Sequence, residues 1–283
     1  MQLKRILITG ANSYIGISFE KWVSRWPDDY YINTVDTQKD WSKTSFAQFD
    51  IVLHVAAIVH QNKKKQKTET YYKVNCELAY EVALKAKEEG VKQFVFLSTM
   101  GVYGKYEGNI DSKTEPNPKT HYAKSKLMAE DKIKSLENKN FKVTILRPPL
   151  VYGKNCKGNY TRLSRLALKT PVFPKIKNRR SMIHIDNLCE CIRLLIDEQE
   201  QGIFFPQNSA YVNSTEMVAR IAEIHHKKVH LTKLFNPLIN LLTKYMIVFQ
   251  KVFGSLIYDQ DLSHYKKDYN VVSFEESLEL TEK

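Results

Sequence analysis

The stretch LKRILITGANSYIG, residues 3–16, decides the fold of this chain. Its first part, residues 3–9, is a short apolar run that predicts a strand, and residues 14–26 have the apolar spacing of a helix. Gly10 permits the tight turn between them, and Gly16 allows the helix to lie close to the strand. The first N–H groups of such a helix attract an anion such as a pyrophosphate. We therefore predict a dinucleotide-binding turn, with Ser13 at the usual place of a middle glycine, made by Gly10, Asn12, Ser13, Tyr14, Ile15 and Gly16.

Strands and helices alternate along the first half of the chain. Further strands are expected at residues 30–35, 51–55, 94–97 and 142–146, with helices at 71–89 and 121–136. Helical crossovers between strands imply a parallel sheet that is covered on both faces. The predicted fold class is α/β, a Rossmann-type doubly wound parallel sheet with a smaller C-terminal substrate-binding lobe. The Rossmann domain is assigned residues 1–152, with 184–206 returning to it, and the lobe residues 153–183 and 207–283.

The composition is that of a globular protein with a basic surface. The 283 residues are 43% hydrophobic and 26% charged, with a net charge of +12 that suits nucleic acid or a polyanionic small ligand. The densest basic cluster, residues 63–65 with Lys67, has no aromatic residues between its lysines. We interpret it as a solvated loop and expect no nucleic-acid partner. The sequence shows no secretory signal or membrane span, so a cytoplasmic location is expected. The spacing of the four cysteines predicts reduced thiols and no metal site.

Two carboxylates follow the second predicted strand. Asp36 stands 26 residues after Gly10, where a carboxylate accepts hydrogen bonds from an adenosine ribose and repels a 2′-phosphate. NAD is therefore favoured over NADP as the cofactor, and NADP stays open. Asp40 is a second candidate, for the adenine end. The alternative for Asp36 is an acidic residue that merely opens a loop.

Tyr122 and Lys126 form a Y-x-x-x-K pattern on a predicted helix. A spacing of four residues puts both on one face, and a neighbouring ammonium favours the phenolate that a base needs near neutral pH. Ser98 and Thr99 end the strand at 94–97, at the sheet edge where doubly wound folds bind ligands. A threonine there can assist proton transfer. We predict Thr99, Tyr122 and Lys126 as catalytic residues, with Ser98, Tyr122 and Lys126 also beside the cofactor.

Several motifs, in order along the chain, resemble those of the extended short-chain dehydrogenase/reductases, the NAD-dependent epimerase/dehydratase family. They are TGANSYIG at residues 9–16, Asp36, HVAA at 54–57, STMGVYG at 98–104, YAKSK at 122–126 and LRPPLVYG at 146–153. The resemblance runs through to the C-terminal segment. It implies a bound nicotinamide dinucleotide, with Ala56 and Ala57 among the residues that line its site.

Residues 158–163, 178–181 and 186–188 look most like a branch of this family that acts on UDP-sugars for bacterial capsule and O-antigen synthesis. In UDP-galactose 4-epimerase-like proteins, the arginine that matches Arg180 binds the substrate diphosphate, a task that suits a guanidinium fork. An amide matching Asn159 approaches the same group. The resemblance thus implies Thr99, Tyr122, Asn159 and Arg180 as substrate-binding residues. The alternatives are a surface charge for Arg180 and a helix N-cap for Asn159.

The resemblance also implies a shared half-reaction, in which Tyr122 removes the proton of the sugar 4-hydroxyl and hydride passes from carbon 4 to NAD. An NAD-dependent UDP-hexose 4-epimerase returns the hydride to the other face of the 4-keto sugar. A UDP-4-keto-6-deoxy-sugar 4-reductase instead consumes NAD(P)H. Asp36 favours the epimerase. A non-catalytic dinucleotide-binding regulator is disfavoured by the complete Thr–Tyr–Lys set, and a dehydratase by Met100 and Gly101, where similar dehydratases carry Asp-Glu.

Residues 234–253 combine apolar residues at helical spacing with Lys244 and Lys251 and follow Lys233. Either this stripe lies on an anionic membrane, or it packs in the substrate lobe or against another subunit. The stretch leads into residues 254–256, which resemble the family's substrate loop, and it holds few lysines. We therefore expect packing, a protein that anionic vesicles do not sediment, and no stable membrane insertion. A homodimer is left open.

Overall fold

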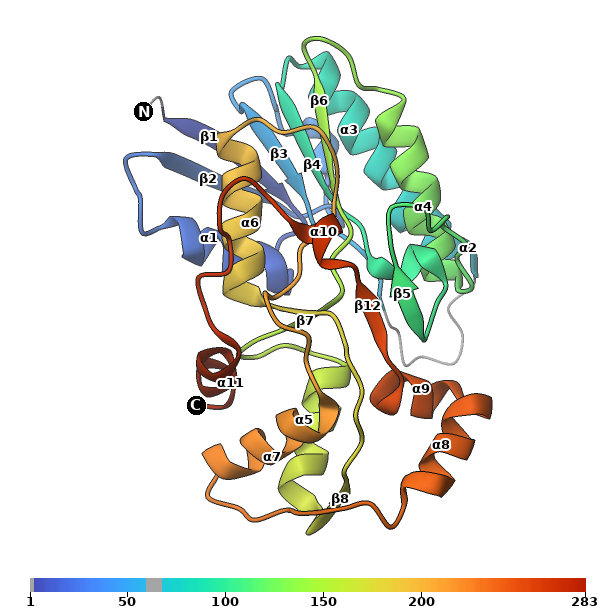
Figure 1. The fold of residues 1–283 in the computed structure, drawn as a ribbon. Helices are drawn as coiled ribbons and strands as arrows, with labels where there is room; N and C mark the ends of the chain where they lie inside the picture. Colours follow the sequence, from blue (N-terminus) through green and yellow to red (C-terminus); the bar gives the residue numbers. More distant parts are fainter. Residues whose placement is uncertain (1–2, 60–67) are drawn as a thin grey trace. The chain divides into compact units, whose positions relative to one another are not determined.

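The apolar run Ile6–Leu7–Ile8 is fully buried in strand β1 (Lys4–Thr9), inside a parallel sheet. The computed structural model describes residues 3–59 and 68–283, so the basic cluster at residues 63–65 and Lys67 lies outside the described residues. The chain divides into two units (Figure 1). The first unit contains the residues up to Gly104, Glu115–Pro148 and Cys189–Phe205, and the second contains Lys105–Thr114, Pro149–Leu188 and Pro206–Lys283.

The first unit is built on a six-stranded parallel sheet of order β10-β6-β4-β3-β1-β2. The other strands are β2 (Tyr30–Val35), β3 (Ile51–His54), β4 (Gln93–Leu97), β6 (Lys142–Leu146) and β10 (Gly202–Phe204). The strand order reverses at β1, where Thr9 is level with Val35 on one side and His54 on the other. This confirms the doubly wound α/β fold, and the reversal marks the edge at which such sheets bind ligands.

Helices cover both faces of this sheet. Figure 1 shows α1 (Tyr14–Val23) and α6 (Ile185–Asp197) on one face and α3 (Leu78–Glu88) and α4 (His121–Lys134) on the other. The apolar side chains between α3, α4 and the sheet, among them Leu7, Val82, Phe94 and Ile133, are fully buried in one cluster. The sheet and both helical layers thus hold the strand ends in fixed register.

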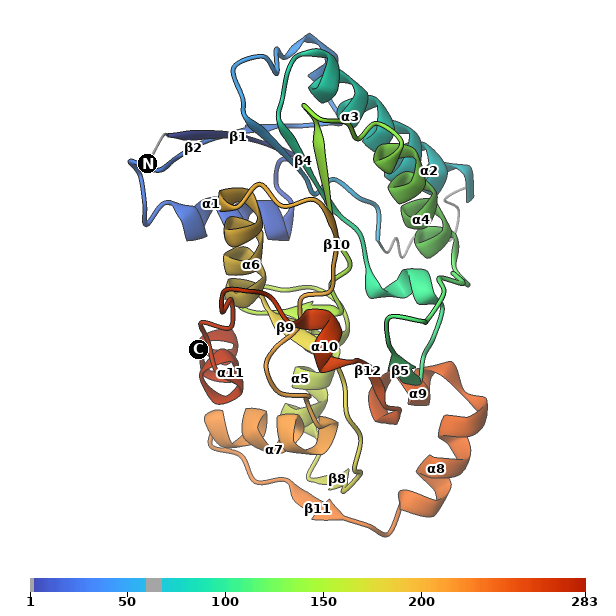
Figure 2. The same ribbon diagram turned by 45° about the horizontal axis from the view of Figure 1, so that its top comes forward.

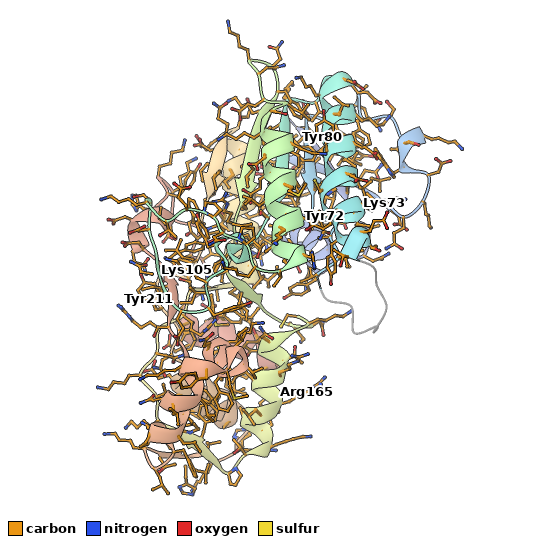
Figure 3. The ribbon with its side chains drawn as sticks, turned by 90° about the vertical axis from the view of Figure 1, so that its right-hand side faces the viewer. Tyr72, Lys73, Tyr80, Lys105, Arg165 and Tyr211 are labelled. Atoms are coloured by element: carbon orange, nitrogen blue, oxygen red, sulfur yellow. The ribbon has the colours of Figure 1, made fainter. Side chains whose placement is uncertain are left out.

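The helix expected at residues 71–89 is interrupted. It begins as α2 (Thr68–Tyr72), passes through a π-helical segment (Lys73–Glu77) and continues as α3. Figure 3 labels Tyr72, Lys73 and Tyr80 along it. Asn75, fully buried in the wide turn, exchanges hydrogen bonds with the backbone of Ile58 and donates to Ser125 Oγ at 3.1 Å. An extra residue in the turn turns this amide inward, a use that is common for π-bulges.

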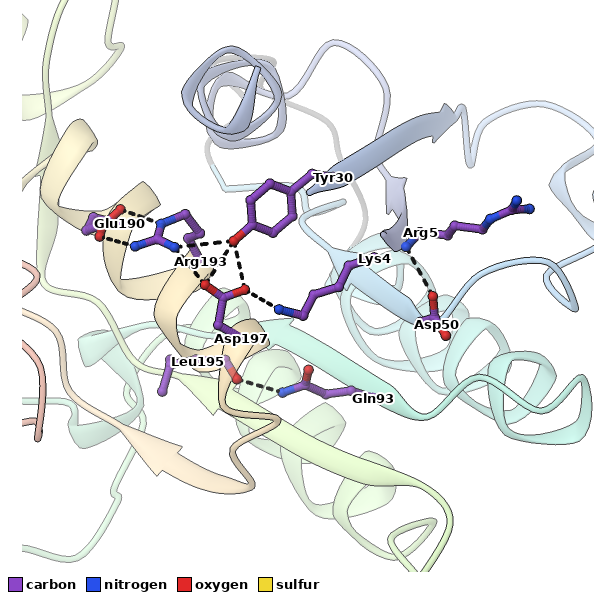
Figure 4. Close-up of polar contacts among 9 residues, drawn as sticks. All are labelled: Lys4, Arg5, Tyr30, Asp50, Gln93, Glu190, Arg193, Leu195 and Asp197. Carbon is purple, nitrogen blue, oxygen red and sulfur yellow. Dashed lines mark hydrogen bonds and ion pairs between the residues drawn. The ribbon is translucent and has the colours of Figure 1, made fainter. Parts of the chain in front are cut away.

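Helix α6 is tied to the sheet by a polar network, drawn in Figure 4. Asp197 at its end accepts hydrogen bonds from Tyr30 Oη at 2.7 Å, Lys4 Nζ at 2.5 Å and Arg193 Nη1 at 2.6 Å. Arg193 also pairs with Glu190, one turn earlier. Nearby, Gln93 donates to the carbonyl of Leu195 at 3.1 Å, and Asp50 accepts from Arg5 N. Charges from β1 and α6 therefore neutralise one another, and the neutral phenol of Tyr30 on β2 joins them through hydrogen bonds.

The second unit has three short parallel strand pairs. They are β5 (Gly108–Ile110) with β12 (Leu256–Tyr258), β7 (Leu150–Tyr152) with β9 (Met182–His184), and β8 (Val172–Pro174) with β11 (His230–Thr232). Its helices, best separated in Figure 2, are α5 (Asn159–Lys169), α7 (Ser214–Ile224), α8 (Asn236–Tyr245), α9 (Ile247–Phe253), α10 (Gln260–Ser263) and α11 (Phe274–Glu282). Its core joins α5, α7 and α11 through Tyr160, Met217 and Leu278.

The stretch at residues 234–253 forms two helices, separated at Met246. In α8 only Ile239 is buried, and α9 has no buried residue. Most of the apolar side chains of this stripe therefore do not pack within the lobe, and the other part of the expectation, packing against another subunit, stays a prediction. No helix among residues 3–59 and 68–283 is both long and apolar enough to cross a membrane. All four cysteines are free thiols, as expected.

Candidate active site

The turn after β1 requires both of its glycines. Gly10 has φ +111, and a Cβ placed on it would lie 2.7 Å from Ala56 N. A Cβ on Gly16 would lie 2.6 Å from Ser13 Oγ and 3.1 Å from Ile8. Side chains at these positions would push the start of α1 away from the strands. The two glycines therefore hold the helix terminus against the sheet edge.

Ser13 does not adopt the left-handed backbone conformation that would favour a glycine at this position. It is extended, with φ −71, and its Oγ caps α1 by accepting from Gly16 N at 3.0 Å. The left-handed residue is its neighbour Asn12, with φ 66, a conformation that asparagine tolerates. The departure from a three-glycine turn thus leaves a well-capped helix N-terminus, whose first amides have no partner within the helix.

The two acidic candidates differ in their surroundings. Asp36 directly follows β2, whose last carbonyl, on Val35, accepts from Gly10 N at 3.0 Å, so the carboxylate is held beside the turn. Its Oδ1 accepts from Gln38 N at 2.9 Å. Asp40 is exposed and forms an ion pair with Lys43. The backbone next to Asp36 is therefore in direct contact with the glycine turn, whereas the Asp40 carboxylate is paired with Lys43.

The alanines of the HVAA motif lie on the third strand's extension. Ala56 is buried and donates its N–H to Thr9 O at 3.0 Å, whereas Ala57 is exposed. Ala56 also supplies the atoms closest to the position that a Cβ on Gly10 would occupy. The end of β3 and the glycine turn are thus in direct backbone contact.

Thr99, Tyr122 and Lys126 come together at the carboxyl end of β4. Thr99 caps a short 3-10 helix (Met100–Tyr103) by accepting from Gly101 N at 3.1 Å, and it hydrogen-bonds the Tyr122 side chain. Tyr122 lies in the first turn of α4, which Thr120 caps. Lys126, one turn later, is 1% exposed, with its Nζ 3.9 Å from the centroid of the Phe96 ring.

Burial moves the two pKa values of this pair in opposite directions. It raises the pKa of Tyr122 to about 12, against the lowering effect of the Thr99 hydrogen bond. It lowers the pKa of Lys126 to about 7, against the raising effect of the Glu130 charge. Without a ligand, the phenol therefore keeps its proton at neutral pH and the lysine sits near its titration midpoint.

A buried network of ionic side chains lies beside this pair, and the sequence motifs did not predict it. Glu130 is 2% exposed. Its Oε2 accepts hydrogen bonds from Arg147 Nε at 3.1 Å and from Arg147 Nη2 at 2.5 Å. Ser98 Oγ also donates to Glu130, and Arg147 Nη1 donates to Tyr103 Oη at 2.9 Å. The Ser98 hydroxyl, a cofactor candidate, is thus engaged by protein. Glu130 follows Lys126 by four residues, a helix-face spacing that could have indicated it.

His54 closes the buried side of the site. Its Nδ1 shares a hydrogen bond of 2.7 Å with Thr9 Oγ1, and its ring stacks between those of Phe94 and Phe96 at 5.9 Å from each. Burial, aided by the positive charge of Lys126, lowers the pKa of His54 to about 3. The imidazole is therefore neutral at every physiological pH.

The two substrate candidates belong to the second unit. Asn159 is exposed as the first residue of α5, and the N-cap is Gly158, so the N-cap alternative for Asn159 is wrong. Arg180 donates through Nη1 to the carbonyls of Gln250 at 3.1 Å and Gly254 at 3.0 Å. Burial lowers its pKa to about 10, so it stays cationic at neutral pH. In the part of the chain that the structure describes, no carboxylate lies within ion-pair distance of its guanidinium.

Known proteins are similar to this chain in sequence and in fold. A UDP-glucose 4-epimerase of Vibrio cholerae is 28% identical over 250 residues, which are 77% of this chain and 75% of the relative. An N-acetyl-α-D-glucosaminyl-diphospho-ditrans,octacis-undecaprenol 4-epimerase of Escherichia coli O157:H7 is 27% identical over 254 residues, covering 82% and 76%. The fold also matches that of UDP-glucuronic acid 4-epimerase from Bacillus cereus in complex with NAD, with a TM-score of 0.75 and 18% identity over 98% and 97% of the two chains.

Of the solved structures with this fold, the Bacillus cereus epimerase is in complex with NAD and RMD from Pseudomonas aeruginosa is in complex with NADPH. The model of one family, described as the NAD dependent epimerase/dehydratase family, matches residues 6–205. This range includes the glycine turn, Asp36, Thr99, Tyr122 and Lys126. The chain therefore belongs to the NAD dependent epimerase/dehydratase family, whose members are NAD-dependent enzymes.

Proposed function

We propose that this protein is an NAD-dependent UDP-hexose 4-epimerase that works through a 4-keto intermediate and serves surface-polysaccharide synthesis. The observation that carries the proposal is the joining of Thr99, Tyr122 and Lys126 at the end of β4, at the same sheet edge as the glycine turn after β1. A threonine, a phenol and a buried ammonium in this order supply what reversible proton transfer at a sugar hydroxyl needs.

The residues around the glycine turn fit a dinucleotide. The N-terminus of α1 offers amides and a positive dipole end to a pyrophosphate. Asp36, held beside Gly10 through the Val35 carbonyl, suits two vicinal ribose hydroxyls as a hydrogen-bond acceptor. When bound, NAD would supply the hydride acceptor and donor for carbon 4 of the sugar.

The chain's own residues would handle the proton. Tyr122 Oη would take the 4-hydroxyl proton in one direction and return it in the other, with Thr99 orienting the phenol through their hydrogen bond. The ammonium of Lys126 lowers the energy of the phenolate, and Glu130 keeps that ammonium charged to higher pH than burial alone would allow. Lys126 is therefore an electrostatic aid to Tyr122 rather than a second base.

Arg180 and Asn159 are proposed to hold the diphosphate of the substrate. The backbone carbonyls of Gln250 and Gly254 hold the Arg180 guanidinium in place. The guanidinium keeps its positive charge, and a charged guanidinium suits a phosphate partner. Asn159 is exposed at the first position of α5, where its amide and the helix N-terminus both favour an anion. The reduced thiols, Cys76, Cys189 and Cys191 among them, fit a cytoplasmic location.

One experiment tests the proposal against the reductase alternative. The purified protein is incubated with UDP-glucose or UDP-N-acetylglucosamine without added cofactor, and the 4-epimers are separated by chromatography. In parallel, a UDP-4-keto-6-deoxy sugar is supplied with NADH or NADPH, and absorbance reports cofactor oxidation. Epimer formation without net cofactor consumption supports the proposal. Stoichiometric oxidation of the added cofactor, with no epimers formed, would make the enzyme a 4-reductase.

A further inference from the structure

An exposed apolar surface runs along α8 and α9 of the second unit. Its members, called here the α8–α9 face, are large apolar side chains with exposed fractions between 48% and 80%: Leu234, Leu238, Leu241, Tyr245, Ile247 and Val248. Isolated exposed apolar residues are ordinary, but a contiguous group of them indicates an interaction site. Most of the apolar side chains of residues 234–253, for which packing was expected, are therefore exposed.

The spacing of these residues makes one surface of them. Within α8, Leu238, Leu241 and Tyr245 follow one another at intervals of three and four residues, which is the period of a single helix face, and Leu234 lies in the turn just before the helix. Ile239 lies on the other side and is buried. The helix thus separates an inner side from an outer apolar side, as an amphipathic helix does.

The inner side of the two helices is firmly attached to the rest of the second unit. Asn236 Nδ2, in the first turn of α8, donates to the carbonyl of Lys175 at 3.0 Å. At the end of α9, the carbonyl of Val252 accepts from Asn178 at 3.2 Å and from Ser214 at 2.6 Å. The outward orientation of the α8–α9 face is therefore fixed by hydrogen bonds.

The charged residues of the segment that carries this face have a single sign, and Glu107, from another segment, lies beside Gly254 at its end. Residues 224–258 contain five lysines and no aspartate or glutamate. Three of these lysines, Lys233, Lys244 and Lys251, are exposed and lie within or beside α8 and α9. Apolar side chains bordered by lysines match an anionic bilayer surface, where the former enter the acyl boundary and the latter meet the phosphates.

We propose that the α8–α9 face docks this protein onto an anionic membrane surface, with α8 and α9 lying in the interface. A second copy of the chain fits the face less well, because a two-fold interface would bring the lysines of both copies, all of one sign, into a single contact. Insertion across the bilayer is excluded by length, since α8 has 10 residues and α9 has 7. We therefore expect anionic vesicles to sediment the protein, in place of the expectation drawn from the sequence alone.

Docking at this face would place the proposed diphosphate arginine close to the bilayer. Gln250, whose carbonyl holds Arg180 at 3.1 Å, lies in the same helix as Ile247 and Val248. A sugar diphosphate carried on a lipid would therefore meet Arg180 beside the docked helix. This consequence rests on the proposed function, whereas docking itself does not.

Vesicle co-sedimentation of the full chain tests the proposal. We expect binding to vesicles made of equal parts phosphatidylcholine and phosphatidylglycerol, and none to phosphatidylcholine alone. The pair Leu238→Gln and Leu241→Gln should weaken binding at least about tenfold through lost apolar burial. The pair Lys233→Glu and Lys244→Glu should do the same, since each lysine near an anionic surface contributes about fivefold.

Matched variants of exposed residues away from the face serve as controls. Leu166→Gln with Leu280→Gln, and Lys21→Glu with Lys139→Glu, should leave vesicle binding within twofold of the unchanged chain, an expectation that follows from their absence from the face. All variants should keep the circular dichroism and melting temperature of the parent. Because docking needs no catalysis, Tyr122→Phe should bind vesicles normally even if the proposed function is wrong.

Two results would overturn the proposal. One is an unchanged chain that stays in the supernatant with anionic vesicles at physiological ionic strength. The other is equal weakening by the control pairs, which would show that total charge rather than this face drives binding. If the protein is instead a dimer by sedimentation equilibrium, and the Leu238→Gln, Leu241→Gln pair makes it a monomer without vesicle binding in either form, the face joins two copies.

Discussion

At the scale of single residues, burial shifts the pKa values of Tyr122 and Lys126 in opposite directions. The pKa of the phenol rises to about 12 and that of the ammonium falls to about 7, although both lie near 10 in water. The ligand-free pair therefore favours the uncharged state as pH rises above neutrality. Additional positive charge near Tyr122 is needed before the phenol can act as a base.

Tyr122→Phe removes the hydroxyl but keeps the ring. We expect turnover to fall by at least about a hundredfold, the usual scale for a lost general acid–base, with sugar-nucleotide affinity little changed. Steady-state epimerisation and calorimetric titration measure the two effects. Tyr80→Phe, on α3, is the matched control and should turn over normally. Near-normal turnover of Tyr122→Phe would remove this residue from the mechanism.

Asp36 and Asp40 form a natural comparison for cofactor choice. NAD should bind more tightly than NADP, because Asp36 repels a 2′-phosphate. Asp36→Asn should narrow the ratio of the two dissociation constants by roughly tenfold, the size of one charge interaction at a partly solvated site. Asp40→Asn should leave the ratio unchanged, since that carboxylate pairs with Lys43. Fluorescence titration gives both constants, and tighter binding of NADPH by the unchanged chain would contradict the assignment.

At the scale of elements, α6 is attached to the sheet through charge rather than through apolar contact alone. Asp197 gathers Lys4 from β1, Tyr30 from β2 and Arg193 from its own helix, and its side chain is 10% exposed. The same carboxylate, together with burial, raises the pKa of Tyr30. Removal of one partner from such a buried group leaves the others uncompensated.

Asp197→Ala should therefore lower the free energy of unfolding by about 3 kcal/mol or more. Urea denaturation followed by circular dichroism measures the change. The control is Glu223→Ala, which breaks an ion pair with Arg220 where the Glu223 side chain is 68% exposed. That loss should stay below about 1 kcal/mol. Equal effects of the two substitutions would show that the α6 network contributes no more than a surface pair.

At the scale of the whole molecule, the sequence predicted the sheet and the placing of Tyr122 and Lys126 on one helix because both depend on local spacing. The glycine turn, the Tyr122–Lys126 pair and the alternation of elements each lie within one short segment. Glu130 and Arg147 were missed because their pairing joins distant segments. The α8–α9 face was misjudged because periodicity shows that a helix has an apolar side, but not what covers it.

The acid sensitivity of the fold should depend on His54. Its pKa is lowered from 6.5 to about 3, so between these values the unfolded chain binds a proton that the folded chain does not. The contribution of His54 to stability is therefore complete above pH 6.5 and is lost as pH falls toward 3. The expected loss is about 1.4 kcal/mol per pH unit over that window.

Unfolding free energies measured in urea from pH 7 to pH 4 test this sign. His54→Asn, which keeps an acceptor for Thr9, should be less stable at pH 7 but should show a flatter decline toward acid. His230→Asn, at an exposed histidine, should follow the slope of the unchanged chain. An unaltered slope for His54→Asn would mean that another group controls the acid limb.

The first unit is composed of three separate stretches of chain, the last of which ends at Phe205. During synthesis, β6 cannot pair with β10, its neighbour at the sheet edge, until residues 149–188 of the second unit have been made. At about 5–20 residues per second this interval lasts several seconds. A nascent chain of 148 residues would expose the open edge of β6 and leave Lys4 and Tyr30 without Asp197. An unpaired edge strand is a site of aggregation, so the two units should be produced together rather than as separate fragments.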